Sequence, residues 1–422
     1  MFNIFFIWFG KTLSWLLRLS RHHGAALPGL IIERLHPKFL NSMLTKLPEG
    51  VIIVSGTNGK TTTTKMITEL LRSQGKRVLT NRTGGNFVRG VFSTIVQAAT
   101  LSGRLPYDVA VYEQDEAYAV RFVKLHEPRA AVLLNVTRDQ LDRFGEIDTT
   151  AALLQRVANH TSQAVVVNDD DIRLNKIVVT GSVKAVYFGV SKNLQAQFPN
   201  DEQLYGALSQ DLTKHKRTVE LEATGEKLAK YKLDAKTLEA KLQIDGQHNA
   251  LNGAAALATV HQLYPDVPLD DFVKTLSNIK PAFGRGERID FGGKTLILQL
   301  IKNPASFRQA LHVLDIHKPK AVGIVINDNH ADGRDVSWLW DIDFKPLAGL
   351  PVVTSGIRGF DMANRLKYDD VSVEGVESDL KKMVDEVGRR AEPGQTAIIF
   401  ATYTAMLATR KAIGRLTKVE KV

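Results

Sequence analysis

The chain has 422 residues, enough for two or three domains with their own hydrophobic cores. Its 55 Lys and Arg against 45 Asp and Glu give a net charge of +10, which favours an anionic partner of unspecified kind. Long runs of like charge and aromatic-basic repeats do not occur, so the sequence disfavours a nucleic-acid-binding protein. Cysteine is absent, which excludes disulfides, thiolate zinc sites and a cysteine nucleophile and fits a reducing cytoplasm.

The first 20 residues combine an apolar opening with later basic residues. The opening contains Asn3, is too short to span a bilayer and lacks the charge order of a signal peptide. At helical spacing two stripes can be traced, one with Phe6, Phe9, Leu13, Leu16 and Leu17 and one with Lys11, Ser14, Arg18 and Arg21. Two alternatives stand: a helix packed on its own domain, or a basic amphipathic helix lying peripherally on the inner face of an anionic membrane. One short apolar helix is expected between this segment and residue 50.

The stretch Val51–Thr64, VIIVSGTNGKTTTT, has the pattern of a buried strand, a glycine turn and a helix. Such a turn binds phosphate through backbone N–H groups and the positive end of the helix, while Lys60 reaches the β- and γ-phosphates and the Thr61 hydroxyl ligates Mg²⁺. The match to the general phosphate-loop pattern is incomplete, because Val54 stands at its first glycine position. The predicted nucleoside-triphosphate-binding residues are Gly56, Thr57, Asn58, Gly59, Lys60, Thr61 and Thr62.

Downstream of this loop, strand and helix patterns alternate. Strands are predicted at Lys76–Leu79, Tyr107–Tyr112, Ala130–Leu134 and Ala164–Val167, each followed by polar residues. Ligands bind at the carboxyl ends of parallel strands. The polar residues after these strands are therefore expected to converge on the sheet edge that carries the phosphate loop.

Several side chains after these strands are candidates for chemistry. Glu113 and Glu116 follow a strand end, where a carboxylate can hold Mg²⁺ beside a nucleotide, and the choice between them stays open. Asp139 and Asp142 suit either a site or a helix cap. His248, at a predicted helix start, suits a capping, core or catalytic position.

The chain from residue 191 onward changes character twice. Residues 191–243 are polar and Lys/Glu-rich, and they predict a peripheral insertion of short strands or hairpins. A helix rich in small residues follows from 246, and a turn-rich boundary is expected at 281–288. Beyond it a second alternation predicts a Rossmann-like α/β domain. Its expected elements are strands Thr295–Leu300, Ala321–Ile326, Pro351–Thr354 and Thr396–Phe400 and a helix Ala305–Leu314. The predicted domains are an N-terminal helical segment 1–45, a central domain 46–280 and a C-terminal domain 281–422.

Asp328, Asp332 and Asp335 follow the second strand of this later domain, close to Arg334. Three carboxylates so close in sequence form either a solvated turn or, at the end of a strand, a site.

These motifs together resemble the Mur ligase family. GTNGKTTT, TNRTGGNFVRG, a Glu-bearing strand end, NVTRDQLDRFGE and GQHNALNGAAA follow the order of its central domain, and Asn303-Pro304 and the NDN at 327–329 are similar to motifs of its C-terminal domain. RDQLDRFGE, NDNHADGRDVSWLWDIDF and ATYTAML resemble the MurT group, the ligase-like subunits of lipid II isoglutaminyl synthase. The resemblance implies an α/β Mur-ligase-like fold: a P-loop central domain with a parallel sheet, a C-terminal Rossmann-like domain and a truncated N-terminal domain.

The sequence departs from the wider family in two ways. Gln140 stands where ordinary Mur ligases have His, and the segment before the phosphate loop is short. As in the MurT group, this argues for a lipid-carried substrate rather than a soluble UDP-sugar. Members of that group often carry a four-cysteine zinc ribbon, which this chain cannot form, so no zinc is expected.

The resemblance implies a mechanism with ATP and Mg²⁺. The α-carboxylate of D-glutamate in the lipid II stem peptide is phosphorylated, and ammonia attacks the acyl phosphate to give D-isoglutamine. A GatD-type glutamine amidotransferase subunit, forming a heterodimer with this chain, supplies the ammonia, and Asp335, or as second choice Asp332, completes that partner's catalytic triad. Glu113 and Glu116 are the other expected catalytic residues. Further nucleotide contacts are expected from Asn249, Arg285, Asn303 and Asp328.

Two other functions remain open at the level of sequence. One is a stand-alone amino-acid-adding ligase of the Mur or folylpolyglutamate type, against which the short N-terminus and Gln140 count. The other is a non-catalytic ATP-binding scaffold.

Overall fold

The computed structural model describes residues 2–19, 27–81, 87–137, 147–198, 214–225, 227–244, 246–280 and 285–419. The chain divides into two compact units. The first draws on Met1–Thr137, Ile147–Leu242 and Gln247–Ile279, and the second is formed mainly by Lys280–Val422.

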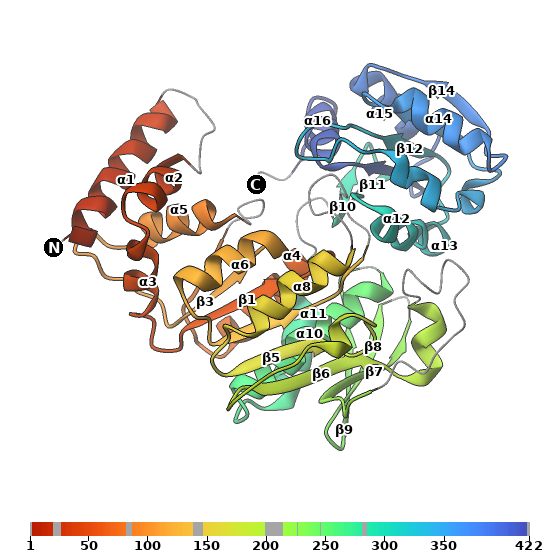
Figure 1. The fold of residues 1–422 in the computed structure, drawn as a ribbon. Coiled ribbons are helices and arrows are strands. Elements are labelled where there is room, and N and C mark those ends of the chain that lie inside the picture. The colour runs from red at the N-terminus through yellow and green to blue at the C-terminus, as the bar shows by residue number, and fades with distance from the viewer. Residues whose placement is uncertain are drawn as a thin grey trace. The chain divides into compact units, whose positions relative to one another are not determined.

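The first unit is built on one large sheet, whose described strands run in the order β2-β3-β1-β4-β5-β6-β7-β8-β9 (Figure 1). Neighbours from β2 to β7 are parallel, whereas β7, β8 and β9 pair antiparallel. The strands are β1 (Val51–Ser55), β2 (Val78–Thr80), β3 (Val109–Glu113), β4 (Ala130–Leu133), β5 (Ala164–Asn168), β6 (Lys184–Val190), β7 (Val219–Thr224), β8 (Leu228–Leu233) and β9 (Lys236–Lys241). The loop after β1 thus lies between the ends of β3 and β4.

Helices cover both faces of this sheet, which is why every residue of β1 is buried. Alternate strand residues such as Val51 and Ile53 pack in the core that holds α5 (Val88–Ala98), α6 (Glu116–Leu125) and α8 (Ile147–Ala158). On the other face lie α4 (Lys60–Ser73), α10 (Gln247–Leu263) and α11 (Leu269–Asn278). The predicted small-residue helix forms as α10 and packs closely on the sheet, because a Cβ on Gly253 would lie 2.3 Å from the Tyr231 hydroxyl.

The N-terminal segment forms α1 (Phe2–Leu19), α2 (Leu27–Leu35) and α3 (Lys38–Leu44). The expectation of one short helix after the first segment was wrong, because two form there. The apolar stripe traced on the first helix is packed only in part: Phe6 is buried, but Phe9 and Leu16 are exposed. The packed face instead follows Gly10, where a Cβ would come within 2.7 Å of Val96 on α5, so only glycine permits this approach.

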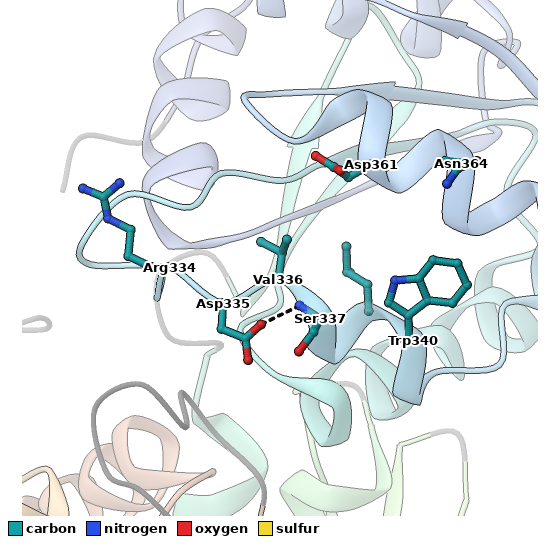
Figure 2. Close-up of a pocket in the computed structure, with 8 residues that line it drawn as sticks. Arg334, Asp335, Val336, Ser337, Trp340, Asp361 and Asn364 are labelled. Carbon is teal, nitrogen blue, oxygen red and sulfur yellow. Dashed lines mark hydrogen bonds between the residues drawn. The ribbon is translucent and has the colours of Figure 1, made fainter.

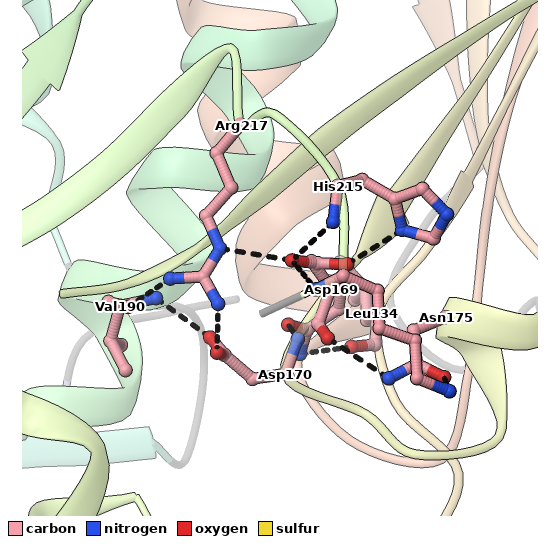
Figure 3. Close-up of polar contacts among 9 residues, drawn as sticks. Leu134, Asp169, Asp170, Asn175, Val190, His215 and Arg217 are labelled. Carbon is pink, nitrogen blue, oxygen red and sulfur yellow. Dashed lines mark hydrogen bonds and ion pairs between the residues drawn. The ribbon is translucent and has the colours of Figure 1, made fainter. Parts of the chain in front are cut away.

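The 191–243 region forms strands β7, β8 and β9 as predicted, but these extend the main sheet rather than standing apart from it. A buried ionic cluster lies beside them (Figure 3). Arg217 Nε is 3.2 Å from Asp169 Oδ2, its Nη2 is 2.6 Å from Asp170 Oδ1, and His215 Nδ1 is 2.8 Å from Asp169 Oδ1. Burial raises the pKa of Asp170 to about 6 in spite of Arg217. The cluster ties the chain before β7 to the end of β5.

The second unit is a doubly wound α/β domain, whose described strands run in the order β10-β11-β15-β12-β13-β14. All neighbours are parallel except β10 and β11. The strands are β10 (Arg285–Asp290), β11 (Thr295–Leu300), β12 (Val322–Val325), β13 (Val352–Ser355), β14 (Val373–Val376) and β15 (Thr396–Ala401). One core holds α12 (Pro304–Leu311), α13 (Val313–His317) and the 3₁₀ helices η3 (Ser337–Asp341) and η4 (Lys345–Leu347), with Met362 and Leu366 of α14 (Gly359–Lys367), and the other holds α15 (Leu380–Arg389) and α16 (Tyr403–Ile413).

Two expectations for this unit need correction. The prediction of a turn-rich boundary at 281–288 was wrong for residues 285–288, because β10 begins at Arg285 and pairs antiparallel with β11. The helix predicted at 305–314 is divided into α12 and α13, although His312 between them keeps helical dihedral angles (φ −62, ψ −18). Among the described residues, no helix combines the length and apolar character that crossing a membrane requires.

Candidate active site

The loop between β1 and α4 has the backbone that its glycines allow. Gly56 and Gly59 adopt φ values of 127° and 88°, which strain any side-chain-bearing residue. At Gly59 a Cβ would also lie 2.4 Å from Asn252 Oδ1 of α10. Helix α4 begins at Lys60, directly after Gly59. Its positive end therefore faces the loop, as a phosphate site requires.

The end of β4 holds this loop in place. Asn135 Oδ1 accepts a hydrogen bond from the Asn58 N–H (2.8 Å), and Asn135 Nδ2 donates to the Asn58 carbonyl (3.0 Å). Thr137 Oγ1 accepts a further bond from Asn58 Nδ2 (3.0 Å). Polar residues after β4 therefore do converge on the phosphate loop, as predicted. The sequence did not single out Asn135 and Thr137 as its anchors.

Lys60 lies at the centre of a cluster of oxygen atoms. Its Nζ donates to the carbonyls of Gly56 (2.6 Å) and Thr57 (3.3 Å), and lies 3.1 Å from Asp115 Oδ1 and 3.8 Å from Glu116 Oε2. The side chain is almost fully buried. The sequence did not identify Asp115, although it follows the same strand as the predicted Glu113.

Thr61 and Glu113 are in direct contact beside this cluster. The Thr61 hydroxyl lies 2.9 and 2.8 Å from the two carboxylate oxygens of Glu113. The side-chain amide of Asn81, after β2, makes two hydrogen bonds with the backbone of Glu113. Its Nδ2 donates to the carbonyl and its Oδ1 accepts from the N–H (3.0 Å each). No group of three His, Cys, Asp or Glu side chains suited to a metal occurs among the described residues. A hydroxyl and one carboxylate fit Mg²⁺ that takes its remaining ligands from phosphate and water.

Thr62 and Asn249 lie close to the loop in different ways. Thr62 is buried in the first turn of α4. Asn249 is buried on α10, and its Oδ1 accepts from Nδ2 of Asn252, the residue that packs on Gly59. Asn249 therefore lies one side chain away from the loop.

In the second unit, Asp332 and Asp335 both lie in the loop after β12, but their surroundings differ. Asp332 is buried, accepts from the Thr404 backbone N–H (2.7 Å) and has a pKa raised by burial. Asp335 is half-exposed, and its Oδ1 accepts from the Ser337 N–H at 2.8 Å. It lines a pocket of ≈ 360 Å³ that Trp340 also lines (Figure 2). Asp332 therefore stabilises the loop, while Asp335 lines a pocket that a ligand or another chain can enter.

Two family models match the chain, the Mur ligase middle domain over residues 54–260 and the MurT ligase C-terminal over residues 300–406. The chain is 28% identical to the lipid II isoglutaminyl synthase (glutamine-hydrolyzing) subunit MurT of Streptococcus pneumoniae strain R6, over 96% of this chain and 95% of that one. It is 27% identical to the Staphylococcus aureus strain COL subunit of the same name, over 83% and 84%. The chain belongs to the MurT group of the Mur ligase family.

Solved structures of Mur ligases have the same fold as this MurT-group chain. MurF from Acinetobacter baumannii superposes with a TM-score of 0.70 at 19% identity, covering 92% of this chain and 80% of that one. MurF from Thermotoga maritima, solved in complex with ADP, gives a TM-score of 0.68 at 18% identity, over 90% and 83%. The predicted family, α/β fold and enzyme class, a ligase, are confirmed.

The remaining nucleotide contacts expected for a MurT-group protein stay predictions. Asn303 caps α12, with its Oδ1 accepting from the Ser306 N–H (2.8 Å). Asp328 pairs with Arg358 (2.8 Å). Arg285 begins β10, and its side chain lies outside the described residues, as do Asp139 and Asp142. Asn303 and Asp328 thus have structural partners in this unit.

Proposed function

We propose that this chain is the ATP-dependent synthetase subunit of a lipid II isoglutaminyl synthase. It amidates the α-carboxylate of the D-glutamate in the lipid II stem peptide, giving D-isoglutamine, ADP and phosphate. The observation that carries the proposal is the cluster of Lys60, Thr61, Glu113 and Asp115 around a phosphate-type loop, in a chain similar to MurT subunits over nearly its whole length.

The loop and Lys60 would bind the triphosphate. The N–H groups at the start of α4 would face the phosphates, and Lys60 would exchange its contact with Asp115 for the β- and γ-phosphate oxygens. Thr61 and Glu113 are the residues suited to hold Mg²⁺, which neutralises charge on the phosphates. Preorganised positive charge at this position stabilises the phosphoryl group in transit.

The reaction would have two steps. An oxygen of the substrate carboxylate attacks the γ-phosphorus, ADP leaves, and an acyl phosphate forms. Ammonia then attacks the acyl carbon, phosphate leaves with the carbon–oxygen bond electrons, and the nitrogen loses a proton to give the amide. Activation is necessary because a carboxylate is a poor electrophile, whereas phosphate is a good leaving group.

Ammonia would come from a GatD-type glutamine amidotransferase subunit in a heterodimer. This chain has no cysteine and so cannot form the thioester of a cysteine-dependent glutaminase itself. Asp335 is the residue proposed to complete the partner's triad, because its carboxylate is accessible at the pocket with Trp340. Asp332 is the weaker choice, because Thr404 and the loop backbone already use its oxygens. Since the substrate is lipid-carried, the heterodimer would work at a membrane surface.

The test is amidation by the reconstituted pair, with lipid II, ATP and either glutamine or ammonium as nitrogen source, followed by mass spectrometry of the stem peptide. Lys60→Ala should abolish amidation from both sources. Asp335→Asn should abolish the glutamine-dependent reaction and leave the ammonium-dependent one. Intact glutamine-dependent amidation by Asp335→Asn would refute the assignment of that residue. Turnover of ATP with a free amino acid and no partner would instead favour a stand-alone amino-acid ligase, and product formation by Lys60→Ala a non-catalytic scaffold.

A further inference from the structure

Helix α1 exposes an apolar face. Seven of its described side chains are exposed, and six of these are apolar, the exception being Thr12. The six are Ile4 (37%), Phe5 (65%), Trp8 (55%), Phe9 (37%), Trp15 (60%) and Leu16 (50%). Their spacing of three, four and seven residues places them along one side of the helix. A surface helix normally turns charged side chains outward, so the exposed apolar side chains of α1 depart from that rule.

The opposite side of α1 fixes this orientation. Phe6, Ile7 and Gly10 are buried against the rest of the first unit, and Gly10 permits close contact with α5. Lys11 Nζ donates to the Gln97 carbonyl (3.0 Å), and Trp8 Nε1 donates to the Leu101 carbonyl (2.9 Å). The orientation of the outward face is therefore fixed by packing and by two hydrogen bonds.

The exposed apolar surface continues beyond the helix. Leu101, which accepts the hydrogen bond from Trp8, is itself 60% exposed. Gly103 lies in the same turn, where a Cβ would contact Ile4 at 3.0 Å. Next to it Arg104 is exposed. We call the six apolar side chains of α1 together with Leu101 the aromatic face.

We propose that the aromatic face docks the protein on an anionic lipid membrane, with α1 lying in the plane of the interface. The choice of a membrane rests partly on the proposed function, in which the substrate is carried by a lipid. Trp and Phe are the side chains that settle at the boundary of headgroups and acyl chains. A helix of 18 residues extends over about 27 Å, long enough to lay the whole face on a flat surface.

The charge of the segment supports a lipid partner. Residues 1–48 contain one acidic residue, Glu33, and six basic ones: Lys11, Arg18, Arg21, Arg34, Lys38 and Lys46. Glu33 is buried and pairs with Arg121 at 2.9 Å. Anionic headgroups attract basic residues next to an apolar helix, and no acidic side chain lies on the aromatic face to oppose them. A second copy of this chain would present the same positive charge and be repelled.

The test is cosedimentation of the full chain with vesicles that contain neither lipid II nor nucleotide, so that failed binding and failed amidation remain separate results. We expect binding to vesicles with phosphatidylglycerol and weaker binding to pure phosphatidylcholine. Phe5→Ser with Trp15→Ser should lower binding by about tenfold or more. The matched control, Val178→Ser with Leu407→Ser, removes two exposed apolar side chains outside α1 and should leave binding unchanged.

Fluorescence gives an independent readout of the same face. In a Trp338→Phe/Trp340→Phe background the remaining tryptophans are Trp8 and Trp15. Brominated acyl chains should quench their emission on vesicle binding. Binding by Phe5→Ser/Trp15→Ser equal to that of the unchanged chain would overturn the proposal. So would the absence of quenching, or sedimentation showing that the aromatic face instead joins two copies of the chain.

Discussion

Thr61 and Glu113 meet at 2.8 Å across the ends of two parallel strands, the hydroxyl from the start of α4 and the carboxylate from the end of β3. The pairing register explains why they meet, because Val54 of β1 lies opposite Glu113 of β3. Glu116, by contrast, is turned towards Lys60 at 3.8 Å. The two glutamates that the sequence left as equivalent metal ligands therefore have different partners.

This difference predicts different effects on Mg²⁺. Glu113→Gln keeps a hydrogen-bond acceptor for Thr61 but loses the charge, so the Mg²⁺ concentration for half-maximal ATP turnover should rise by about 10-fold to 100-fold. Glu116→Gln should leave that concentration within about threefold and change the affinity for ATP instead, because Glu116 faces Lys60. Mg²⁺ titrations of ATPase activity measure both. Equal effects of the two variants would contradict the assignment.

The contacts of Lys60 predict that its stability and binding roles can be separated. In Lys60→Met, the mostly buried carboxylates of Asp115 and Glu116 lose the cation that pairs with them. The free energy of unfolding should therefore fall by about 3 kcal/mol. Adding Asp115→Asn should restore much of this stability without restoring binding of a non-hydrolysable ATP analogue. Urea unfolding and calorimetry report the two quantities. Restored binding in the double variant would show that Lys60 does not contact phosphate.

The loop and its strand could be predicted from sequence because their signals are local. A single short stretch of sequence contains the strand, the turn and the helix start: Val51–Ser55, Gly56, Gly59 and Lys60. Most of the central parallel strands were predictable for the same reason, since runs such as Thr295–Leu300 are short, apolar and bounded by turn residues. Strands β6, β10 and β14 were not predicted.

The parts that could not be predicted depend on residues far apart in the chain. Arg217 meets Asp169 and Asp170 across 48 and 47 positions, respectively, and no periodicity marks such a pairing. Asp115 was missed because a carboxylate after a strand has the same local pattern whether it binds a metal or neutralises a lysine. The exposed side of α1 could not be predicted because Gly10, not the largest side chains, decides which face packs.

The ionic cluster around Arg217 predicts how the 191–243 region is stabilised. Arg217→Leu leaves Asp169 and Asp170 buried without their cation, and the free energy of unfolding should fall by about 3–5 kcal/mol. A chelator such as EDTA should leave the melting temperature of the nucleotide-free chain unchanged, because no thiolate zinc site can form. Thermal unfolding with and without EDTA measures both effects. A chelator-induced loss of stability would point to a structural metal.

His126 predicts a loss of stability in acid. Burial lowers its pKa from 6.5 to about 4, and its ring contacts Asn41 Oδ1 at 2.8 Å. Below pH 6.5 the unfolded chain binds a proton that the folded chain does not, so stability falls as the pH drops from 6.5 towards 4, by up to about 3 kcal/mol. His126→Asn should remove this part of the pH dependence. The variant's own free energy of unfolding at pH 8 is the internal reference. The free energy of unfolding is measured with urea from about pH 4.5 to about pH 7, which covers the titration. If it depends on pH in the variant as it does in the unchanged chain, the prediction is contradicted.

Trp340 predicts where the partner subunit binds. Its ring is 53% exposed yet held in place, with Arg365 Cζ 5.2 Å from its centroid and Tyr368 packed edge-on at 5.0 Å. An exposed, preorganised tryptophan beside a pocket is typical of a residue that dominates an interface. Trp340→Ala should weaken association with the glutaminase subunit by about tenfold or more and lower glutamine-dependent amidation at limiting partner. Ammonium-dependent amidation should be unchanged. Phe360→Ala is the matched control, because Phe360 is 76% exposed but does not line the pocket. Equal losses in both variants, measured by calorimetric titration of the two subunits, would place the interface elsewhere.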